Sequence, residues 1–291
     1  MEPPNKHSRS NDEPTMSQSL PDLSTLPESV LVHILSFMDP KEAIQTCVLS
    51  KQWRNLWTCI PSLNFDKRVF KGTGAAFVHF VTNMLYFRGA SKLHTFRLYW
   101  QASQQKVSTC SEEICQIHVS AARAWIFSAL SCKPVVISLN LQGFTNLKLP
   151  HALFTCASLE QLKLYVFKNN EEDVLPKYVN LPNLKKLRLR SFTLNNPVMQ
   201  GILSGCPLLD KLFLCGCSLN FSEMKSDLVR EFIIVNSRGS GVVEICMPNL
   251  VSLYLVNDFP RLTKLYLKNT PSLVNMFVCY RRFVEYYISG T

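Results

Sequence analysis

The sequence predicts an α/β protein in two parts: a three-helix module over residues 20–66, then a solenoid of stacked repeats with a curved parallel sheet over residues 67–291. Helix-capping residues and apolar residues at helical spacing fill the first part, and L-x-x-L-x-L blocks recur along the second. Charge divides the chain at the same place. The first part holds three Lys or Arg against five Asp or Glu, and the second holds 26 against 13. We therefore expect two surfaces with different partners.

The N-terminal module shows clear helix start and stop signals. Thr25-x-x-Glu28 has the spacing of a capping box, and apolar residues at helical period predict a first helix from about Pro27 to Phe37. Asp39-Pro40-Lys41-Glu42 has the same features and predicts a second helix that ends near Val48. Ser50 can cap a third helix, on which Trp53, Leu56, Trp57 and Ile60 recur before Pro61 ends it.

A module of about forty residues is marginal for burying its own core, so we expect its surplus apolar surface to bind a partner. The alternative is a plain three-helix bundle whose apolar residues are all internal. The size of the module favours the first interpretation.

The second part repeats itself. Blocks of L-x-x-L-x-L start at Leu159, Leu184 and Leu209, in equal steps whose length is within the range of leucine-rich repeats. Further blocks start at Leu250, Leu262 and Leu273, in much shorter steps, and we expect these last turns to be compressed. Weaker blocks start at Leu93, Val136 and Val229, and residues 111–131 are expected to be helical.

Each block predicts one strand of a parallel sheet with the leucines in the core, so the residues between and beside the leucines project onto the opposite, concave face. That face reads as basic and aromatic, without a carboxylate. Its expected members are Gln161, Lys163, Tyr165, Lys186, Arg188, Arg190, Lys211, Phe213, Cys215, Ser252, Tyr254, Val256, Lys264, Tyr266 and Lys268. We expect Lys163, Arg188, Phe213, Tyr254 and Tyr266 to form a stripe across adjacent strands. Such a face suits an acidic or phosphorylated peptide, although an ordinary solvated sheet face would look similar at any single residue.

Other features narrow the classes of protein. Residues 1–19 are polar and are expected to be a flexible tail rather than a signal peptide. No apolar run is long enough to span a membrane. Eleven cysteines without a secretory signal point to a reducing compartment, cytosol or nucleus. Cys215-x-Cys217 and Cys110-x4-Cys115 lack a second ligand pair, so we expect no metal and no cofactor.

The N-terminal residues resemble the F-box, and the whole chain is similar to plant F-box proteins that continue into leucine-rich repeats and often an FBD segment. The matching residues are Leu26-Pro27-Glu28, Ile34-Leu35-Ser36-Phe37, Ala43, Val48-Leu49-Ser50-Lys51, Trp53-Arg54 and Leu56-Trp57. The resemblance implies docking on a Skp-type adaptor, and through it on a cullin and its RING partner. It implies adaptor contacts by Leu26, Pro27, Ile34, Leu35, Val48, Leu49 and Trp53, with Trp57 and Ile60 free to face the core or the linker.

The expected function is therefore that of a non-catalytic, substrate-recruiting subunit of a ubiquitin ligase. Lys163, Lys186, Arg188, Arg190, Phe213, Tyr254 and Tyr266 are the expected substrate contacts. Neither a P-loop, a G-x-S-x-G, an H-E-x-x-H nor a paired-carboxylate signature is present in the sequence. Two alternatives stay open: a basic repeat protein that binds nucleic acid, and a sensor of an anionic small molecule. The given sequence ends at Thr291, so compared with the family pattern we expect it to lack a full FBD segment.

Overall fold

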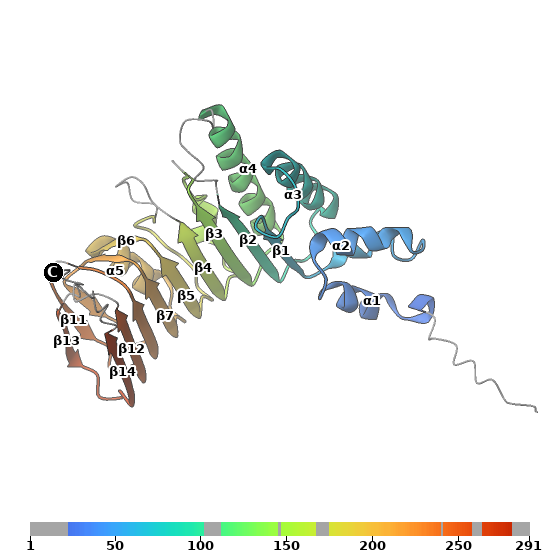
Figure 1. Ribbon diagram of the computed structural model, residues 1–291. Coiled ribbons are helices and arrows are strands. Elements are labelled where there is room, and N and C mark those ends of the chain that lie inside the picture. Colours follow the sequence, from blue (N-terminus) through green and yellow to red (C-terminus); the bar gives the residue numbers. More distant parts are fainter. Residues whose placement is uncertain are drawn as a thin grey trace, which may run out of the picture.

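The computed structural model describes residues 23–101, 112–144, 147–166, 175–239, 241–257 and 264–280. A group of short helices at the N-terminal end leads into a long curved sheet, and helices lie along one face of this sheet (Figure 1). The mixed α/β architecture expected from the sequence is confirmed. The tail predicted for residues 1–19 lies outside the described residues.

The N-terminal module consists of short helices. In order, they are the 3-10 helix η1 (Leu23–Thr25), helices α1 (Glu28–Leu35) and α2 (Pro40–Gln45), and the 3-10 helices η2 (Thr46–Val48) and η3 (Leu56–Cys59). Helix α2 starts as predicted, because the Lys41 N–H donates to Asp39 Oδ1 at 2.8 Å and the Asp39 N–H donates to Glu42 Oε2 at 3.4 Å. The capping box expected at Thr25 and Glu28 is wrong: the N-cap of α1 is Pro27, which makes no side-chain cap hydrogen bond.

The third helix expected after Ser50 forms only as a series of turns followed by η3. Asn55 lies at φ −115° and ψ 0°, far from the ideal α-helix, and the Leu56 N–H donates to the carbonyl of Trp53 with i→i+3 spacing. Trp, Asn and Thr are weak helix formers, so the helical spacing of the apolar residues does not suffice to make a regular α-helix here.

Nine parallel strands form the main sheet, in the order β1-β2-β3-β4-β5-β7-β10-β12-β14. Their bounds are β1 (Ser62–Asp66), β2 (Thr95–Gln101), β3 (Val136–Gln142), β4 (Gln161–Val166), β5 (Lys186–Arg190), β7 (Lys211–Cys215), β10 (Glu231–Val235), β12 (Ser252–Asn257) and β14 (Asn275–Tyr280). Strand β1 falls within the range assigned to the helical module, yet it pairs in parallel with β2. The boundary between the helical module and the repeat region, expected at residue 66, stays a prediction.

The return segments complete each turn of the solenoid on the other side of the sheet. They include helices α3 (Gly74–Arg88), α4 (Glu112–Ser131), η4 (His151–Phe154) and α5 (Asn196–Gly205) and the short strands β6 (Thr193–Asn195), β8 (Ser218–Asn220), β9 (Glu223–Lys225), β11 (Val242–Cys246) and β13 (Lys264–Asn269). Strands β13, β11 and β9 form a second parallel sheet, and β6 pairs with β8. The return segments lie on the outer side of the curve (Figure 1).

The sequence suggested that the last blocks are compressed turns, and this expectation is wrong. Strands β12 and β14 are neighbours in the main sheet, whereas β13, which lies between them in the chain, pairs with β11 in the second sheet. The short steps between these blocks are therefore half turns, and one full turn runs from Ser252 to its register partner Asn275. A strand on the return side needs the same apolar alternation as one on the main sheet, so the pattern alone does not separate them.

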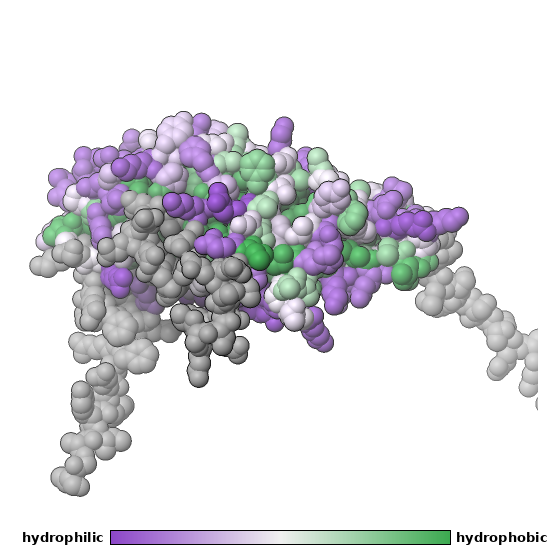
Figure 2. Space-filling view, turned by 90° about the horizontal axis from the view of Figure 1, so that it is seen from above, coloured by the Kyte–Doolittle hydropathy of each residue, from purple (hydrophilic) through white to green (hydrophobic). Residues whose placement is uncertain are grey.

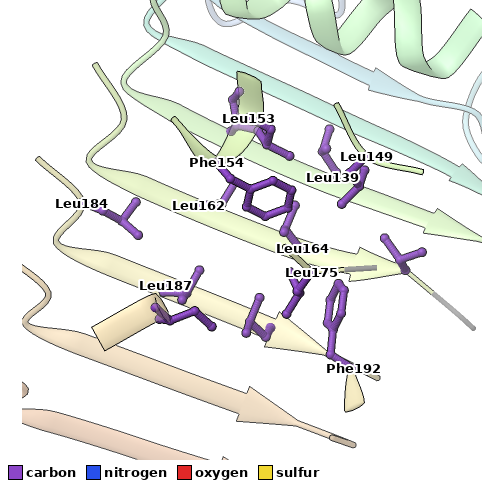
Figure 3. Close-up of a cluster of buried hydrophobic side chains, with 14 of the residues drawn as sticks. Leu139, Leu149, Leu153, Phe154, Leu162, Leu164, Leu175, Leu184, Leu187 and Phe192 are labelled. Atoms are coloured by element: carbon purple, nitrogen blue, oxygen red, sulfur yellow. The ribbon is translucent and has the colours of Figure 1, made fainter. Parts of the chain in front are cut away.

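Leucines hold the turns together in the predicted way. Leu162, Leu187 and Leu212 are in register across β4, β5 and β7 and are buried, as are the leucines two residues further along each strand. Between this sheet and the return segments, leucine and phenylalanine side chains from successive turns pack against one another (Figure 3). The core of the solenoid thus runs continuously from one turn to the next.

Candidate functional site

The N-terminal module has a small core and a conspicuous apolar exterior. Its core consists of six buried residues, Leu31, Leu35, Ala43, Trp53, Leu56 and Ile60. Outside this core, Phe37, Val48 and Leu49 are 78%, 83% and 62% exposed, and Val30 and Ile34 on α1 are also exposed. We call Val30, Ile34, Phe37, Val48 and Leu49 the apolar edge. Single exposed apolar residues are common, but five on a module this small indicate a docking surface.

The structure separates the seven expected adaptor contacts into two groups. Pro27, Ile34, Val48 and Leu49 are exposed, and Leu26 is half-buried. Leu35 and Trp53 are only 0% and 5% exposed because they fill the module's own core. Their role as direct contacts therefore has no support from the geometry. Ile60 is buried and Trp57 packs against both cores, as the sequence allowed.

A second candidate surface is the open face of the main sheet, opposite the return segments. Strand register arranges its residues in three columns. The central column reads Asn64, Arg97, Ser138, Lys163, Arg188, Phe213, Ile233, Tyr254 and Phe277 from β1 to β14. The last column reads Asp66, Tyr99, Asn140, Tyr165, Arg190, Cys215, Val235, Val256 and Cys279, and the first column begins at Ser62 and ends at Asn275.

Positive charge is concentrated on one part of this face. We call Arg97, Lys163, Lys186, Arg188 and Arg190 the basic area. These five cations lie on β2, β4 and β5, and none of them forms an ion pair with a carboxylate among the described residues. Partial burial lowers the pKa of Lys163, and the neighbouring cations Arg188, Arg97 and Lys186 lower it further. A like charge disfavours the protonated amine, so an anion bound here would relieve the repulsion.

Aromatic rings hold two of the arginines in place. The Arg188 guanidinium carbon lies 4.3 Å from the centre of the Phe213 ring, and that of Arg190 lies 4.2 Å from the Tyr165 ring. Cation–π contacts of this kind orient a guanidinium without neutralising it. Both arginines can therefore still donate hydrogen bonds to an anionic group.

Two details of the open face differ from the prediction. Tyr266 and Lys268 lie on β13 in the second sheet, so Tyr266 does not belong to the stripe formed by Lys163, Arg188, Phe213 and Tyr254. Lys264 lies on the same strand. Glu231 supplies a carboxylate in the first column, where it forms an ion pair with Lys211, so the expectation of a face without carboxylates is wrong.

The sequence reasoning also missed several members of the face, among them Arg97 of the basic area and two residues at the other end of the sheet, Ile233 and Phe277. Both are central-column residues, and they belong to the weak block at Val229 and the degraded block at Leu273. The signal was present, because alternation continues through both blocks. Reading the open face from every block, and not only from the leucine-rich ones, would have found them.

The cysteines that suggested a metal spacing have other surroundings. Cys217 is buried, its thiol donates to the carbonyl oxygens of Leu189 and Cys215, and burial raises its pKa to about 11. Cys110 lies outside the described residues. Within the described ranges, no group of three or more His, Cys, Asp or Glu side chains could hold a metal ion. In the same ranges, no helix is long and apolar enough to cross a membrane.

The return side of the molecule does not show a comparable separation of residue types. Viewed from the side that carries α3 and α4, hydrophilic and hydrophobic residues are interspersed along the described surface (Figure 2). Phe77 of α3, Trp125 of α4 and Trp100 of β2 form an aromatic cluster inside the fold. Other apolar residues of the two helices are exposed among polar neighbours, namely Tyr86, Phe87, Ile117 and Phe127. The two candidate surfaces are thus the apolar edge of the module and the open face of the sheet.

A helical module with an apolar edge, joined to a leucine-rich-repeat solenoid, defines a class of two-part binding protein. Comparison with known families agrees with this class. Residues 23–63 match the model of the F-box domain, and residues 131–278 match the model described as FBD-associated F-box protein At5g56370, LRR repeats.

Individual relatives come from Arabidopsis thaliana. The F-box/LRR-repeat protein At3g58900 is 30% identical over 82% of this chain and 75% of its own length. The F-box/LRR-repeat protein At4g14096 is 31% identical over 79% of this chain and 49% of its own length, and the F-box/FBD/LRR-repeat protein At1g13570 is 28% identical over 90% and 55%. The chain belongs to the F-box/LRR-repeat family. It spans about half the length of several of the curated relatives that it matches.

Proposed function

We propose that this protein is a substrate-recruiting subunit of a cullin-type ubiquitin ligase. In this proposal the F-box docks on a Skp-type adaptor through its apolar edge, and the open face of the sheet takes a protein substrate. The exposed Val48 and Leu49, on a module with only six core residues, are the observation that carries it. Exposure of such an apolar surface to water costs free energy, and binding to an adaptor would remove this cost by burying the surface.

The adaptor contacts divide into direct and supporting residues. Leu26, Pro27, Ile34, Val48 and Leu49 reach the outside of the module and would touch the adaptor. Leu35 and Trp53 would act from within by fixing α1 against η3. The Gln52 side-chain amide donates to the Leu26 carbonyl at 3.1 Å and holds the segment before α1 in position.

The adaptor assignment is tested by adding charge to the apolar edge. Val48→Glu with Leu49→Glu should reduce co-purification with a Skp-type adaptor at least about tenfold. Each substitution removes an apolar contact and places a carboxylate in the interface, where its burial costs free energy. Val242→Glu with Val274→Glu is the matched control, since both residues are exposed on the repeat region. Equal adaptor recovery from the two double variants would contradict the assignment.

The substrate contacts follow from the charge of the open face. Lys163, Lys186, Arg188 and Arg190 lack ion-pair partners among the described residues. Phe213 on β7 and Tyr254 on β12 lie on the same face, one and three strands away from β5. We propose an acidic or phosphorylated protein segment as the substrate. Tyr266, on the second sheet, would be outside this contact. The protein would carry out no chemistry itself, because the adaptor connects it to the subunits that transfer ubiquitin.

Charge reversal on β5 tests the substrate face. Arg188→Glu with Arg190→Glu should abolish substrate capture while adaptor binding is retained, and capture by the unchanged protein should fall as salt rises. Both residues are exposed, so the fold should tolerate the change. Full substrate recovery from the reversed protein would move the docking site elsewhere.

A second candidate function rests on the same cations, because basic residues beside aromatic rings also suit single-stranded nucleic acid. A salt-dependent shift of nonspecific RNA or DNA would favour it, and thermal stabilisation by a small anionic metabolite would favour a ligand sensor. The family membership favours the ligase subunit. Within the described part of the chain, nine cysteines are free thiols. Free thiols suit the reducing cytosol or nucleus.

A further inference from the structure

The open face of the sheet changes its chemistry between β5 and β7. On the β2–β5 side, the central and last columns contain Arg97, Lys163, Arg188 and Arg190. On the β7–β14 side, the same columns contain almost only apolar residues. We call the following residues the apolar area: Phe213, Ile233, Val235, Tyr254, Val256 and Phe277. The two areas meet where the Arg188 guanidinium covers the Phe213 ring.

The apolar area is not part of the core of the protein. Its residues point away from the buried leucines, and they are half-buried or exposed, with Phe277 at 52%. The Tyr254 and Phe277 rings are 6.4 Å apart at 43°, so the two rings lie next to each other on adjacent strands. Since a solvated sheet face normally carries polar residues, a continuous apolar strip across four strands indicates that something covers it.

Polar residues of the first column border the apolar area along one edge. In the first column, Glu231 forms an ion pair with Lys211, and the Asn275 amide donates to Ser252 Oγ at 3.2 Å. These groups satisfy one another, and they leave the central and last columns as the apolar path along the face. The path continues directly from the cations of the basic area, so a single segment of chain could lie along both areas.

Strand spacing converts this arrangement into a sequence requirement for the partner. Neighbouring strands are about 4.8 Å apart, so Tyr254 on β12 is about 14 Å from Arg188 on β5, and Phe277 on β14 is about 19 Å away. An extended peptide advances about 3.4 Å per residue. An anionic group held by Arg188 would therefore be about four to six residues from an apolar side chain held between Tyr254 and Phe277.

We propose that the open face recognises a two-part peptide: one or more anionic side chains, and a large apolar side chain about four to six residues away along the same extended segment. The inference rests on the proposed function, and it specifies which substrates that function would select. Charge alone would attract many acidic proteins. The apolar area adds a second condition, and the fixed distance between the two areas makes the pair selective.

A peptide series measures the spacing. Fluorescein-labelled peptides carry three Asp and one Phe on a Gly-Ser background, separated by one to eight residues, in both orders along the chain. Fluorescence anisotropy with the whole protein, in complex with its adaptor, should show the tightest binding at separations of about four to six residues in at least one order. We expect about a tenfold difference between the best and the worst separation. A second set with phosphoserine in place of Asp distinguishes phosphate from carboxylate as the anionic group.

Variants assign each half of the peptide to its area. Arg188→Gln should weaken the best Asp-Phe peptide and leave a peptide with Phe alone unchanged. Phe277→Ser should remove the dependence on spacing and leave weak, salt-sensitive binding of the Asp block. Lys225→Gln, on β9 of the second sheet, removes one positive charge away from the open face and should change nothing. Unchanged thermal unfolding of each variant shows that the fold is intact.

The outcomes separate this inference from the proposed function. Equal binding at every separation and in both orders, by protein that still carries its adaptor, would overturn the two-part peptide and leave the ligase role in place. Failure to bind the adaptor at all would contradict the ligase role whatever the peptides show. Binding that requires Asp but is insensitive to Phe277→Ser would also overturn the inference, since it would reduce recognition to charge alone.

Discussion

The two halves of the solenoid are built differently on their return side. Between β1 and β3 the repeats are long, and their starts at Ser62, Thr95 and Val136 are in register. These repeats have room for the 15-residue helix α3 and the 20-residue helix α4. From β7 onward the repeats are shorter, with starts at Lys211, Glu231, Ser252 and Asn275. Their returns are the short strands β9, β11 and β13.

The difference in length determines what each half can bury. Helices stand further from the sheet than strands do, so the first half accommodates large side chains such as Trp100 and Trp125, whose rings stack 5.1 Å apart. The second half buries mainly aliphatic side chains, with Phe221 and Phe232 as buried aromatic residues. Burial declines at its end: Met276 occupies the register position of Leu212 and Leu253 but is 54% exposed. Repeat length therefore predicts where the solenoid is thick and where it is thin.

The largest expected effect tests this decline in burial. Leu187→Ala and Leu212→Ala should each lower the free energy of unfolding by about 2–5 kcal/mol, because both side chains are buried and leave a cavity. Met276→Ala, at the matching position on β14, should cost well under half of that. Arg188→Ala on the open face should be nearly neutral. Chemical denaturation of the four variants would contradict the comparison if Met276→Ala cost as much as Leu212→Ala.

A smaller effect is expected where α5 separates the two halves. A Cβ added at Gly205 would lie 1.9 Å from the carbonyl oxygen of Val179, in the preceding turn. Gly205→Ala must therefore push the helix away from that turn, and we expect a loss of about 1–3 kcal/mol in unfolding free energy. Gly241→Ala is the control, because nothing among the described neighbours lies within 4 Å of its added Cβ. Equal unfolding midpoints would show that α5 has room to move.

The pH dependence of stability should reveal the dry core next to α5. Burial raises the pKa of the Cys206 thiol from an ordinary value near 9.0 to about 12. The unfolded chain releases this proton near pH 9 and the folded chain retains it, so stability is intact below pH 9 and falls as pH rises toward 12. For one thiol the slope is about 1.4 kcal/mol per pH unit. Cys206→Ala should lose this part of the slope in urea titrations above pH 9, whereas exposed Cys59→Ala should keep it.

The smallest expected effect concerns the ion pair between β7 and β10. Lys211 and Glu231 lie in the first column and are partly exposed, so Lys211→Met should change the unfolding free energy by less than about 1 kcal/mol. The same substitution at Lys185, which pairs with Glu160, should have an equally small effect. A loss of several kcal/mol at Lys211 alone would mean that the pair helps to hold β7 and β10 together.

Much of the fold could be predicted because its signals are local. Alternation within L-x-L placed Leu162, Leu187 and Leu212 in the core, and the Asp39-Pro40 pair placed the start of α2. Each depends on residues within one strand or one helical turn. The same alternation correctly placed Lys163, Arg188 and Phe213 on one face, because side chains on a strand alternate whatever the strand pairs with.

Tertiary structure decided which sheet a strand joins and which side of a helix faces inward. Tyr266 alternates just as Tyr254 does, but β13 pairs with β11, because a half turn brings it to the return side. Leu35 and Ile34 are adjacent in the sequence, and only packing against Trp53 and Leu56 turns Leu35 into the core and leaves Ile34 outside. Hydrogen bonding between strands and packing between helices join residues that are distant in the chain. A local sequence pattern does not specify which distant residues these partners are.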